Sequence, residues 1–221
     1  MGLNMLVNQT NIRESSKQKR KAAILESAEK LFLQKGIDNT TMNDIAKETN
    51  IGVATLFRYF PKKEIIIITI ATSKLQIILT ALQEIDKRTI SCIEKLSLTF
   101  DFFIEQMSEK NGTLPKLLDN FINYSAISNV SLENMEIYTN VRREITTQFI
   151  QMIENGKSDR SIRSDIEITP FISTIFSNFS VFTLKLSLKS NVKVIEPELP
   201  SQKQLQIMKT IFLDYLKPKS I

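Results

Sequence analysis

The sequence predicts an all-α fold in which a three-helix, helix-turn-helix head precedes a larger helical body, with about nine helices in all. Apolar residues recur at spacings of three and four along most of the 221 residues, and no segment alternates like a strand. Polar segments that carry Pro or Gly separate these periods. The expected boundaries are a flexible arm over residues 1–16, the head over 17–62 and the body over 63–221.

The first predicted helix covers residues 17–35 and ends at Gly36. One apolar stripe runs along it, formed by Ile24, Leu25, Ala28, Leu31 and Phe32. Residues 1–16 carry a short apolar patch but lack the apolar core of a signal peptide. We therefore expect a basic arm here and a protein that stays inside the cell.

Two short helices follow, the first opened by Thr40 or Thr41 and the second covering residues 52–59. Ala46 is small enough for close contact between them, Asn50 tolerates the left-handed backbone of a tight turn, and Ile51 is a candidate for burial. These residues predict a helix-turn-helix over residues 40–59.

Pro61 marks a break, after which a long fourth helix is expected from Lys62 to about Arg88. Its segment 65–82 is very apolar, but Lys74 and Gln76 interrupt it, so we expect a buried helix and no membrane partner. The remaining predicted helices cover residues 91–109, 115–127, 131–155, 169–190 and 201–217. The expected breaks are Asn111-Gly112, Asn155-Gly156 and residues 196–200.

Composition excludes several classes of site. The chain has no histidine, one cysteine and five glycines, so it offers no usual general base, no intrachain disulfide and no Gly-rich phosphate loop. We therefore expect no catalytic residues, no metal, no cofactor and a cytoplasmic protein. Residues 1–64 hold 11 Lys and Arg against 7 Asp and Glu, so most of the net charge of +5 lies in and before the head.

Residues 40–64 read TTMNDIAKETNIGVATLFRYFPKKE. This segment resembles the DNA-binding domain of the TetR family of bacterial transcriptional regulators, whose pattern is roughly T-x-x-x-I-A-x-x-A-G-V-S-x-G-T-L-Y-x-Y-F-x-x-K-E. The helix at residues 20–36 also resembles that family's first helix, so about a quarter of the chain carries the resemblance. The sequence departs from the pattern at Thr49-Asn50-Ile51 and at Phe57, which lacks a hydroxyl group.

The resemblance implies that the helix beginning near Gly52 enters the major groove of DNA. Val53, Ala54 and Phe57 are then the residues expected at base edges or thymine methyl groups. Residues expected mainly at phosphates, where they fix the register, are Lys17, Arg20, Thr41, Thr55, Arg58, Tyr59 and Lys63.

The resemblance also implies a cavity in the body that binds an apolar or aromatic small-molecule effector. The candidate lining residues are Phe102, Phe103, Phe121, Tyr124, Tyr138, Arg142, Phe149 and Asn178. Each aromatic residue has plain core packing as its alternative. Arg142 is expected in the apolar stripe of its helix, where it would anchor an acidic group of the effector, pair with Asp101, Glu105 or Asp119, or extend its charge to solvent.

The predicted helix over residues 169–190 is apolar on several faces, so it needs cover on several faces, and the last predicted helix is apolar on one side. In the TetR family two such helices commonly pair into a four-helix dimer interface, which implies a homodimer here. The candidate interface residues are Phe171, Ile175, Phe179, Phe182, Leu205, Met208, Phe212 and Tyr215. The alternative is that these residues are the core of a monomer.

Together these inferences predict a TetR-like regulator, expected to be a repressor that an effector releases from a palindromic operator in double-stranded DNA. Two alternatives remain open from the sequence. One is a constitutive or architectural DNA-binding dimer without a ligand switch, and the other is a small helical enzyme whose head-like segment is coincidental.

Overall fold

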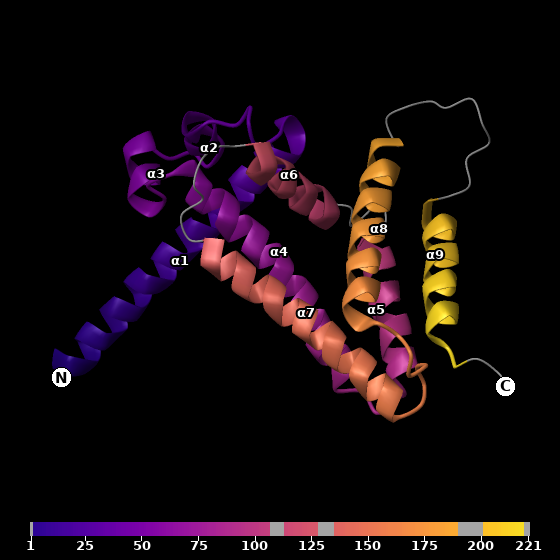
Figure 1. Ribbon diagram of the computed structural model, residues 1–221. Helices are drawn as coiled ribbons and strands as arrows, with labels where there is room; N and C mark the ends of the chain where they lie inside the picture. Colours follow the sequence, from indigo (N-terminus) through magenta and orange to yellow (C-terminus); the bar gives the residue numbers. More distant parts are fainter. Residues whose placement is uncertain (1, 107–112, 128–134, 190–200, 219–221) are drawn as a thin grey trace. The chain divides into compact units, whose positions relative to one another are not determined.

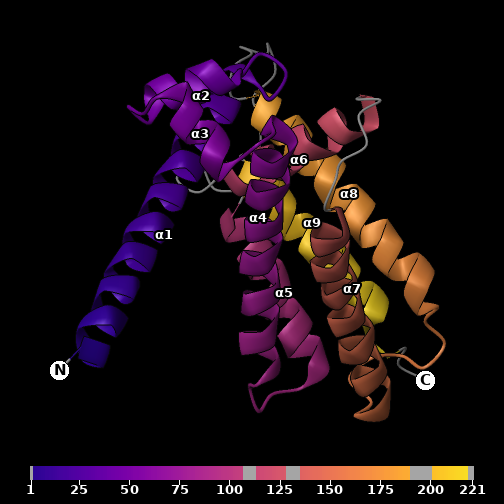
Figure 2. The same ribbon diagram turned by 90° about the vertical axis from the view of Figure 1, so that its left-hand side faces the viewer.

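The computed structural model describes residues 2–106, 113–127, 135–189 and 201–218. Within these residues it contains nine helices and no strand, which confirms the all-α prediction (Figures 1 and 2). The helices are α1 Gly2–Lys35, α2 Met42–Glu48, α3 Val53–Tyr59, α4 Lys63–Asp86, α5 Cys92–Gln106, α6 Thr113–Ile127, α7 Met135–Ser158, α8 Ile168–Lys189 and α9 Ser201–Leu216. Two of the predicted breaks, Asn111-Gly112 and residues 196–200, lie outside the described residues.

The chain forms two compact units. The first comprises residues 1–71 and 120–135, and the second comprises residues 72–119 and 136–221. Helices α4 and α6 each contribute to both units. The boundary expected after residue 62 separates the head from the body, whereas these two units are defined by their compactness. That boundary stays a prediction.

In the first unit, the predicted stripe of α1 is buried at Ile24, Ala28, Leu31 and Phe32, against the neighbouring short helix α2. Helix α1 begins at Gly2, well before the expected start near residue 17. No proline or further glycine interrupts residues 3–35, so nothing in the backbone stops the helix from extending toward the N-terminus. Whether residues 1–16 are flexible stays a prediction.

Helix α4 is apolar around most of its circumference. An 18-residue window of it reaches a mean hydropathy of 2.0, which is enough for a membrane span by length and composition, and half of that window is already buried within the protein. Ile66, Ile67, Leu79 and Leu82 are among its fully buried residues. This burial is the environment that we expected for a core helix.

In the second unit, α5 packs against α9 (Figure 1). Phe100 of α5 stacks on Phe212 of α9 with ring centroids 6.0 Å apart, and Phe171 of α8 meets the same ring edge-on at 6.3 Å. The Lys209 ammonium lies 2.6 Å from the Asp101 carboxylate, so an ion pair also joins α9 to α5. These contacts hold the last helix in place by both apolar and charged groups.

Helix α7 continues through Asn155-Gly156, where a break was expected, and ends at Ser158. The reason is packing. A Cβ atom at Gly156 would lie 2.4 Å from Ile162 Cδ1 and 3.1 Å from Cys92 Cβ, so glycine is needed here for close approach and not to terminate the helix. The turn comes at Arg160, whose φ of 63° is in the left-handed region.

The turn after α7 caps the start of α5. Asp159 Oδ2 accepts a hydrogen bond from the Cys92 amide at 3.0 Å, and Ser161 Oγ accepts one from the Ile93 amide at 3.2 Å. Burial raises the pKa of Asp159, but hydrogen bonds from Ser161 and Cys92 lower it by more, to about 2. Burial and the Asp159 carboxylate also raise the pKa of the Cys92 thiol to about 11, so this thiol is not activated.

We expect an Asp159→Asn variant to lose about 1 kcal/mol of stability at pH 7, because the neutral amide keeps one acceptor oxygen where the carboxylate uses two, and hydrogen bonds to a charged group are stronger. Because the folded pKa of Asp159 lies below its ordinary value of 3.8, the stabilisation is present above pH 3.8 and is lost as the pH falls toward 2. The difference in urea midpoint between the wild type and Asp159→Asn should therefore narrow over that interval. A constant difference from pH 7 to pH 2, or an equal narrowing for the exposed Glu154→Gln control, would contradict the assignment.

Candidate nucleic-acid interface

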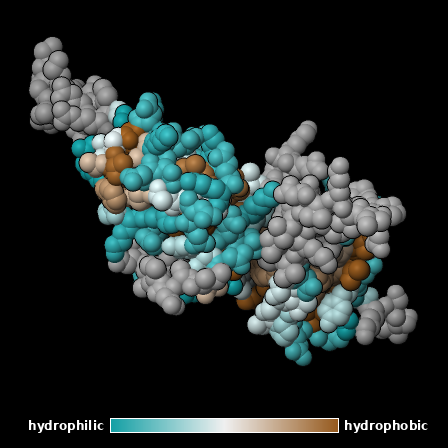
Figure 3. Space-filling view, turned by 90° about the horizontal axis from the view of Figure 1, so that it is seen from above, coloured by the Kyte–Doolittle hydropathy of each residue, from teal (hydrophilic) through white to brown (hydrophobic). Residues whose placement is uncertain are grey.

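Helix α3 presents one face to solvent and one to the core. Leu56 is fully buried, whereas Val53 and Phe57 are 36% and 45% exposed and Ala54 and Arg58 are exposed as well. Phe57 is thus a large aromatic residue exposed to solvent on a helix of seven residues, and the cation Arg58 is next to it in the sequence. The first unit, which contains α3, lies in the left-hand part of Figure 3 and shows a mostly hydrophilic face with a few apolar side chains among the polar ones.

The turn between α2 and α3 has the predicted geometry. Asn50 has a φ of 55°, and the Ile51 amide donates to the Ala46 carbonyl at 2.9 Å, which closes the turn. Ala46 is buried where the two helices meet, Ile51 is half-buried, and Gly52 is the N-cap of α3 without a side-chain hydrogen bond. The sequence therefore predicted the local structure of this motif correctly.

Helix α2 begins with a capping box in which the Asp44 amide donates to Thr41 Oγ1 and the Thr41 amide donates to Asp44 Oδ2. Hydrogen bonds from Lys35 and Thr41 hold the pKa of Asp44 well below its ordinary value. Lys30 of α1 also pairs with Glu48 of α2 at 2.5 Å. The Thr41 hydroxyl is thus already used in capping, and its expected phosphate contact stays a prediction.

The other residues expected at phosphates lie in different environments. Lys17, Arg20 and Arg58 are exposed and form no ion pair with any described residue, whereas Thr55 and Tyr59 are half-buried. Lys21, which belongs to the same basic cluster as Lys17 and Arg20, lies 5.9 Å from the centroid of the Phe60 ring. The exposed cations keep their charges available for an anionic partner.

Lys63 differs from its expected position. Its ammonium donates to the Ile37 and Thr40 carbonyls at 3.0 Å each, and lies 5.7 Å from the centroid of the Tyr124 ring. These contacts direct the amine into the first unit, and they do not support the predicted phosphate contact. Sequence spacing gave no signal for them, because the acceptors are backbone atoms more than twenty residues away.

The candidate effector residues are divided between the two units. Phe121 and Tyr124 are buried in the first unit, whereas Tyr138 and Phe149 are buried in the second. Phe149 meets Phe176 edge-on at 5.2 Å, and the half-buried Phe102 lies beside Phe103 at 5.6 Å. Asn178 is exposed and donates to the Thr174 carbonyl of its own helix. Phe121, Tyr124, Tyr138 and Phe149 are thus buried, and an effector role for any of the candidates stays a prediction.

The placement of Arg142 in the apolar stripe of its helix was wrong. The buried residues of α7 are Tyr138, Val141, Ile145, Phe149, Met152, Ile153 and Gly156, and Arg142 is exposed. The stripe passes from Tyr138 to Val141, three residues on, instead of to Arg142, four residues on. The proposed internal partner Asp101 is paired with Lys209. Because Arg142 is exposed, its charge needs neither an acidic group of an effector nor an internal carboxylate to offset a cost of burial.

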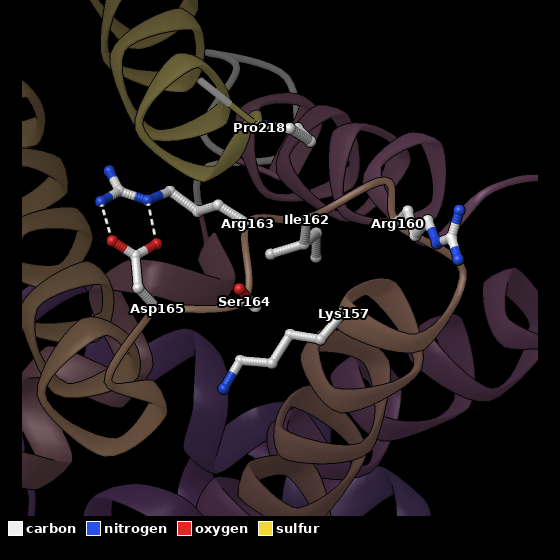
Figure 4. Close-up of a pocket in the computed structure, with 7 residues that line it drawn as sticks. All are labelled: Lys157, Arg160, Ile162, Arg163, Ser164, Asp165 and Pro218. Atoms are coloured by element: carbon white, nitrogen blue, oxygen red, sulfur yellow. Dashed lines mark hydrogen bonds and ion pairs between the residues drawn. The ribbon is translucent and has the colours of Figure 1, made fainter. Parts of the chain in front are cut away.

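The structure also contains a cavity of about 340 Å³ beside the turn after α7 (Figure 4). Its lining residues are Lys157, Arg160, Ile162, Arg163, Ser164, Asp165 and Pro218. Arg163 and Asp165 pair with each other, Lys157 extends along the cavity, and the Arg160 guanidinium points away from it (Figure 4). None of these residues was among the candidates for the effector cavity. Among the described residues, no group of His, Cys, Asp and Glu fits a metal ion.

The candidate dimer residues whose side chains are described fall into three groups by exposure. Phe171, Ile175 and Leu205 are buried within one chain, so they are core residues already, while Met208 and Phe212 are half-buried. Tyr215 is 55% exposed. The side chains of Phe179 and Phe182 lie outside the described residues. Two exposed residues were missed, Ile207 and Ile211, which are 49% and 61% exposed and share a face of α9 with Tyr215 at spacings of four.

Comparison with known proteins agrees with this geometry. Residues 24–69 match the family model described as bacterial regulatory proteins, tetR family. Over 94 residues the chain is 33% identical to an HTH-type transcriptional regulator of Staphylococcus aureus strain USA300, and equally to one of strain N315, covering 42% of this chain. The chain spans about half the length of these curated relatives, with 50% of each covered.

Solved structures show the same fold over most of the chain. The ketosteroid transcriptional regulator KstR2 of Mycobacterium tuberculosis is 17% identical with a TM-score of 0.66, covering 90% of this chain and 96% of its own. The fatty acid degradation regulator FadR of Bacillus halodurans is 14% identical with a TM-score of 0.70, covering 88% and 94%. A Clostridium perfringens putative fatty acid metabolism regulator is 21% identical with a TM-score of 0.65, covering 89% and 100%.

Proposed function

We propose that this chain, a member of the TetR family of bacterial regulatory proteins, is a transcriptional regulator that binds a palindromic operator as a homodimer in the cytoplasm. The observation that carries the proposal is the exposed face of α3. Val53, Ala54 and Phe57 lie on it with Arg58 beside them, over the buried anchor Leu56. Small and apolar side chains of this kind fit base edges and thymine methyl groups, and the cation fits a phosphate.

A homodimer is proposed because α9 carries an uncovered apolar strip. Ile207, Ile211 and Tyr215, hereafter the α9 strip, are each about half or more exposed although their neighbour Leu205 is buried. A face of this kind on two copies related by a twofold axis buries itself. Two DNA-binding heads held about 34–36 Å apart then read two half-sites one helical turn apart.

A repressor released by a small apolar or aromatic effector is proposed for the second unit. The support is its set of aromatic residues, including Tyr138 and Phe149, together with similar folds in regulators named for ketosteroids and fatty acids. The effector must bind the arrangement that does not bind DNA more tightly than the one that does, since equal affinity shifts no population. If no compound of any class tested changes the affinity for the operator, a constitutive DNA-binding dimer would be favoured.

The test is selection of bound sequences from random duplexes by the purified protein at moderate salt, followed by footprinting. Two protected half-sites about one helical turn apart are expected. Weak binding that is independent of sequence would favour an architectural protein. No binding at low salt would refute the proposed function.

We expect an Arg58→Ala variant to bind both the selected operator and unrelated DNA more weakly, because a phosphate contact acts on every sequence. The slope of log K against log salt concentration should become less steep by about 1.8, because the dimer loses one phosphate contact of about 0.9 in each chain. The exposed Arg88→Ala variant in the second unit removes the same charge and is the matched control. An unchanged slope for Arg58→Ala, or an equal change for Arg88→Ala, would exclude this contact.

A further inference from the structure

Lys63 lies at the centre of a group of polar contacts that joins three segments of the first unit. Besides its two hydrogen bonds to the Ile37 and Thr40 carbonyls, its ammonium faces the ring of Tyr124 from α6. The next residue, Glu64, accepts a hydrogen bond from the Tyr124 hydroxyl at 3.4 Å. Both residues at the start of α4 therefore contact the same aromatic side chain.

The two carbonyl groups belong to the turn that leads into the helix-turn-helix. Within this turn the Thr40 amide donates to the Ile37 carbonyl at 3.2 Å, and the buried Thr40 hydroxyl donates to the Gly36 carbonyl at 2.7 Å. Thr41, the N-cap of α2, comes next. Lys63 thus binds the backbone one residue before the cap, so its position affects where α2, and with it α3, begins.

Helix α6 makes a second contact one turn before Tyr124. Asn120 Nδ2 donates to the Phe32 carbonyl of α1 at 3.4 Å, near the end of that helix. Tyr124 is buried, and its burial, followed by the Glu64 charge, raises the pKa of its hydroxyl. The Tyr124 ring also lies over the Lys63 ammonium, and the negative face of the ring attracts its positive charge.

We propose that Lys63 and Tyr124 are positioning residues for DNA binding, which hold the turn before α2 in the arrangement that presents α3 to the groove. In this assignment the Lys63 charge serves backbone carbonyls of its own chain and contacts no phosphate. The inference rests on the proposed function, because it concerns how the same head reads its operator.

The test compares Lys63→Met, which keeps the length of the side chain, and Tyr124→Leu with two controls. Tyr124→Phe keeps the ring over Lys63 and loses only the long hydrogen bond to Glu64, and Ile122→Ala changes a 49% exposed residue of the same helix. Lys63→Met and Tyr124→Leu should each weaken binding to the selected operator by about tenfold, within the usual range of coupling between sites. Unrelated DNA should be bound as by the wild type, and the two controls should bind both DNAs as the wild type does.

The salt dependence separates this role from a phosphate contact. For Lys63→Met the slope of log K against log salt concentration should equal that of the wild type, whereas loss of one phosphate ligand in each chain of the dimer would change it by about 1.8. A changed slope, or wild-type operator affinity in Tyr124→Leu, would overturn the proposal.

A urea unfolding cycle of the same variants gives a result that does not depend on DNA. If Lys63 and Tyr124 act together, the double variant should lose less stability than the two single variants combined. Additive losses would overturn the proposal even if operator binding is observed. Non-additive losses in a protein whose wild type binds no DNA would instead refute the proposed function and leave the contact between the two residues established.

Discussion

An Ala54→Glu variant is expected to lose binding to the selected operator by about a hundredfold or more. Ala54 lies on the exposed face of α3 at its second residue, so a carboxylate there would face the bases and phosphates of the groove. Like charges brought together in an interface cost several kcal/mol, and about 3 kcal/mol corresponds to a factor of roughly 150. Fluorescence anisotropy with the operator duplex measures the loss.

The same substitution should leave the fold intact, because an acidic residue in the first turn of a helix interacts favourably with the helix dipole. The thermal midpoint of Ala54→Glu should therefore match that of the wild type within a few degrees. Ala126→Glu, at an exposed alanine of α6, adds the same charge away from α3 and should bind operator like the wild type. Equal losses in both variants would mean that net charge, and not the α3 face, determines binding.

The head could be predicted closely because its signals are local. Asn50 adopts the left-handed backbone that its short polar side chain tolerates, and Thr41 forms a capping box with Asp44 three residues later. Leu56 and Ala46 are buried at the spacings that the two short helices require. Each of these features depends on residues within a few positions of one another, so the sequence specified them without knowledge of the tertiary fold.

The positions that sequence could not place depend on distant partners. Whether the apolar stripe of α7 passes through Val141 or Arg142 is decided by the helices packed against it, since both spacings fit one helix face. Gly156 has the residue type of a helix end, but its role is to allow close contact with Ile162, which lies beyond the helix. Likewise, Lys63 finds its carbonyl acceptors in a turn that precedes it by more than twenty residues.

The dimer prediction shows the same limit. Helical periodicity identified the apolar character of α8 and α9, but it could not divide their apolar residues between the core of one chain and the surface of contact with another. The structure divides these residues by exposure, because Phe171, Ile175 and Leu205 are buried while the α9 strip remains exposed. The residues that decide dimerisation are therefore expected in the strip, of which only Tyr215 was a candidate.

An Ile211→Asp variant is accordingly expected to be a monomer at micromolar concentration and to bind the operator about a hundredfold more weakly. Ile211 is 61% exposed in the single chain, so aspartate there costs the folded chain little. In a twofold interface each chain would instead bury an unpaired carboxylate, close to its symmetry mate if the strip lies near the axis. Sedimentation equilibrium measures the state of association, and anisotropy measures the affinity.

The matched control is Ile137→Asp on α7, where the isoleucine is 58% exposed and so has nearly the same accessibility. It should remain a dimer, because exposure of a single apolar residue does not make an interface, whereas Ile211 has Ile207 and Tyr215 beside it on the same face. A dimer in both variants would place the interface elsewhere on the chain. A monomeric Ile211→Asp that keeps full operator affinity would show instead that one head suffices for binding, and the palindromic reading of the operator would have to be abandoned.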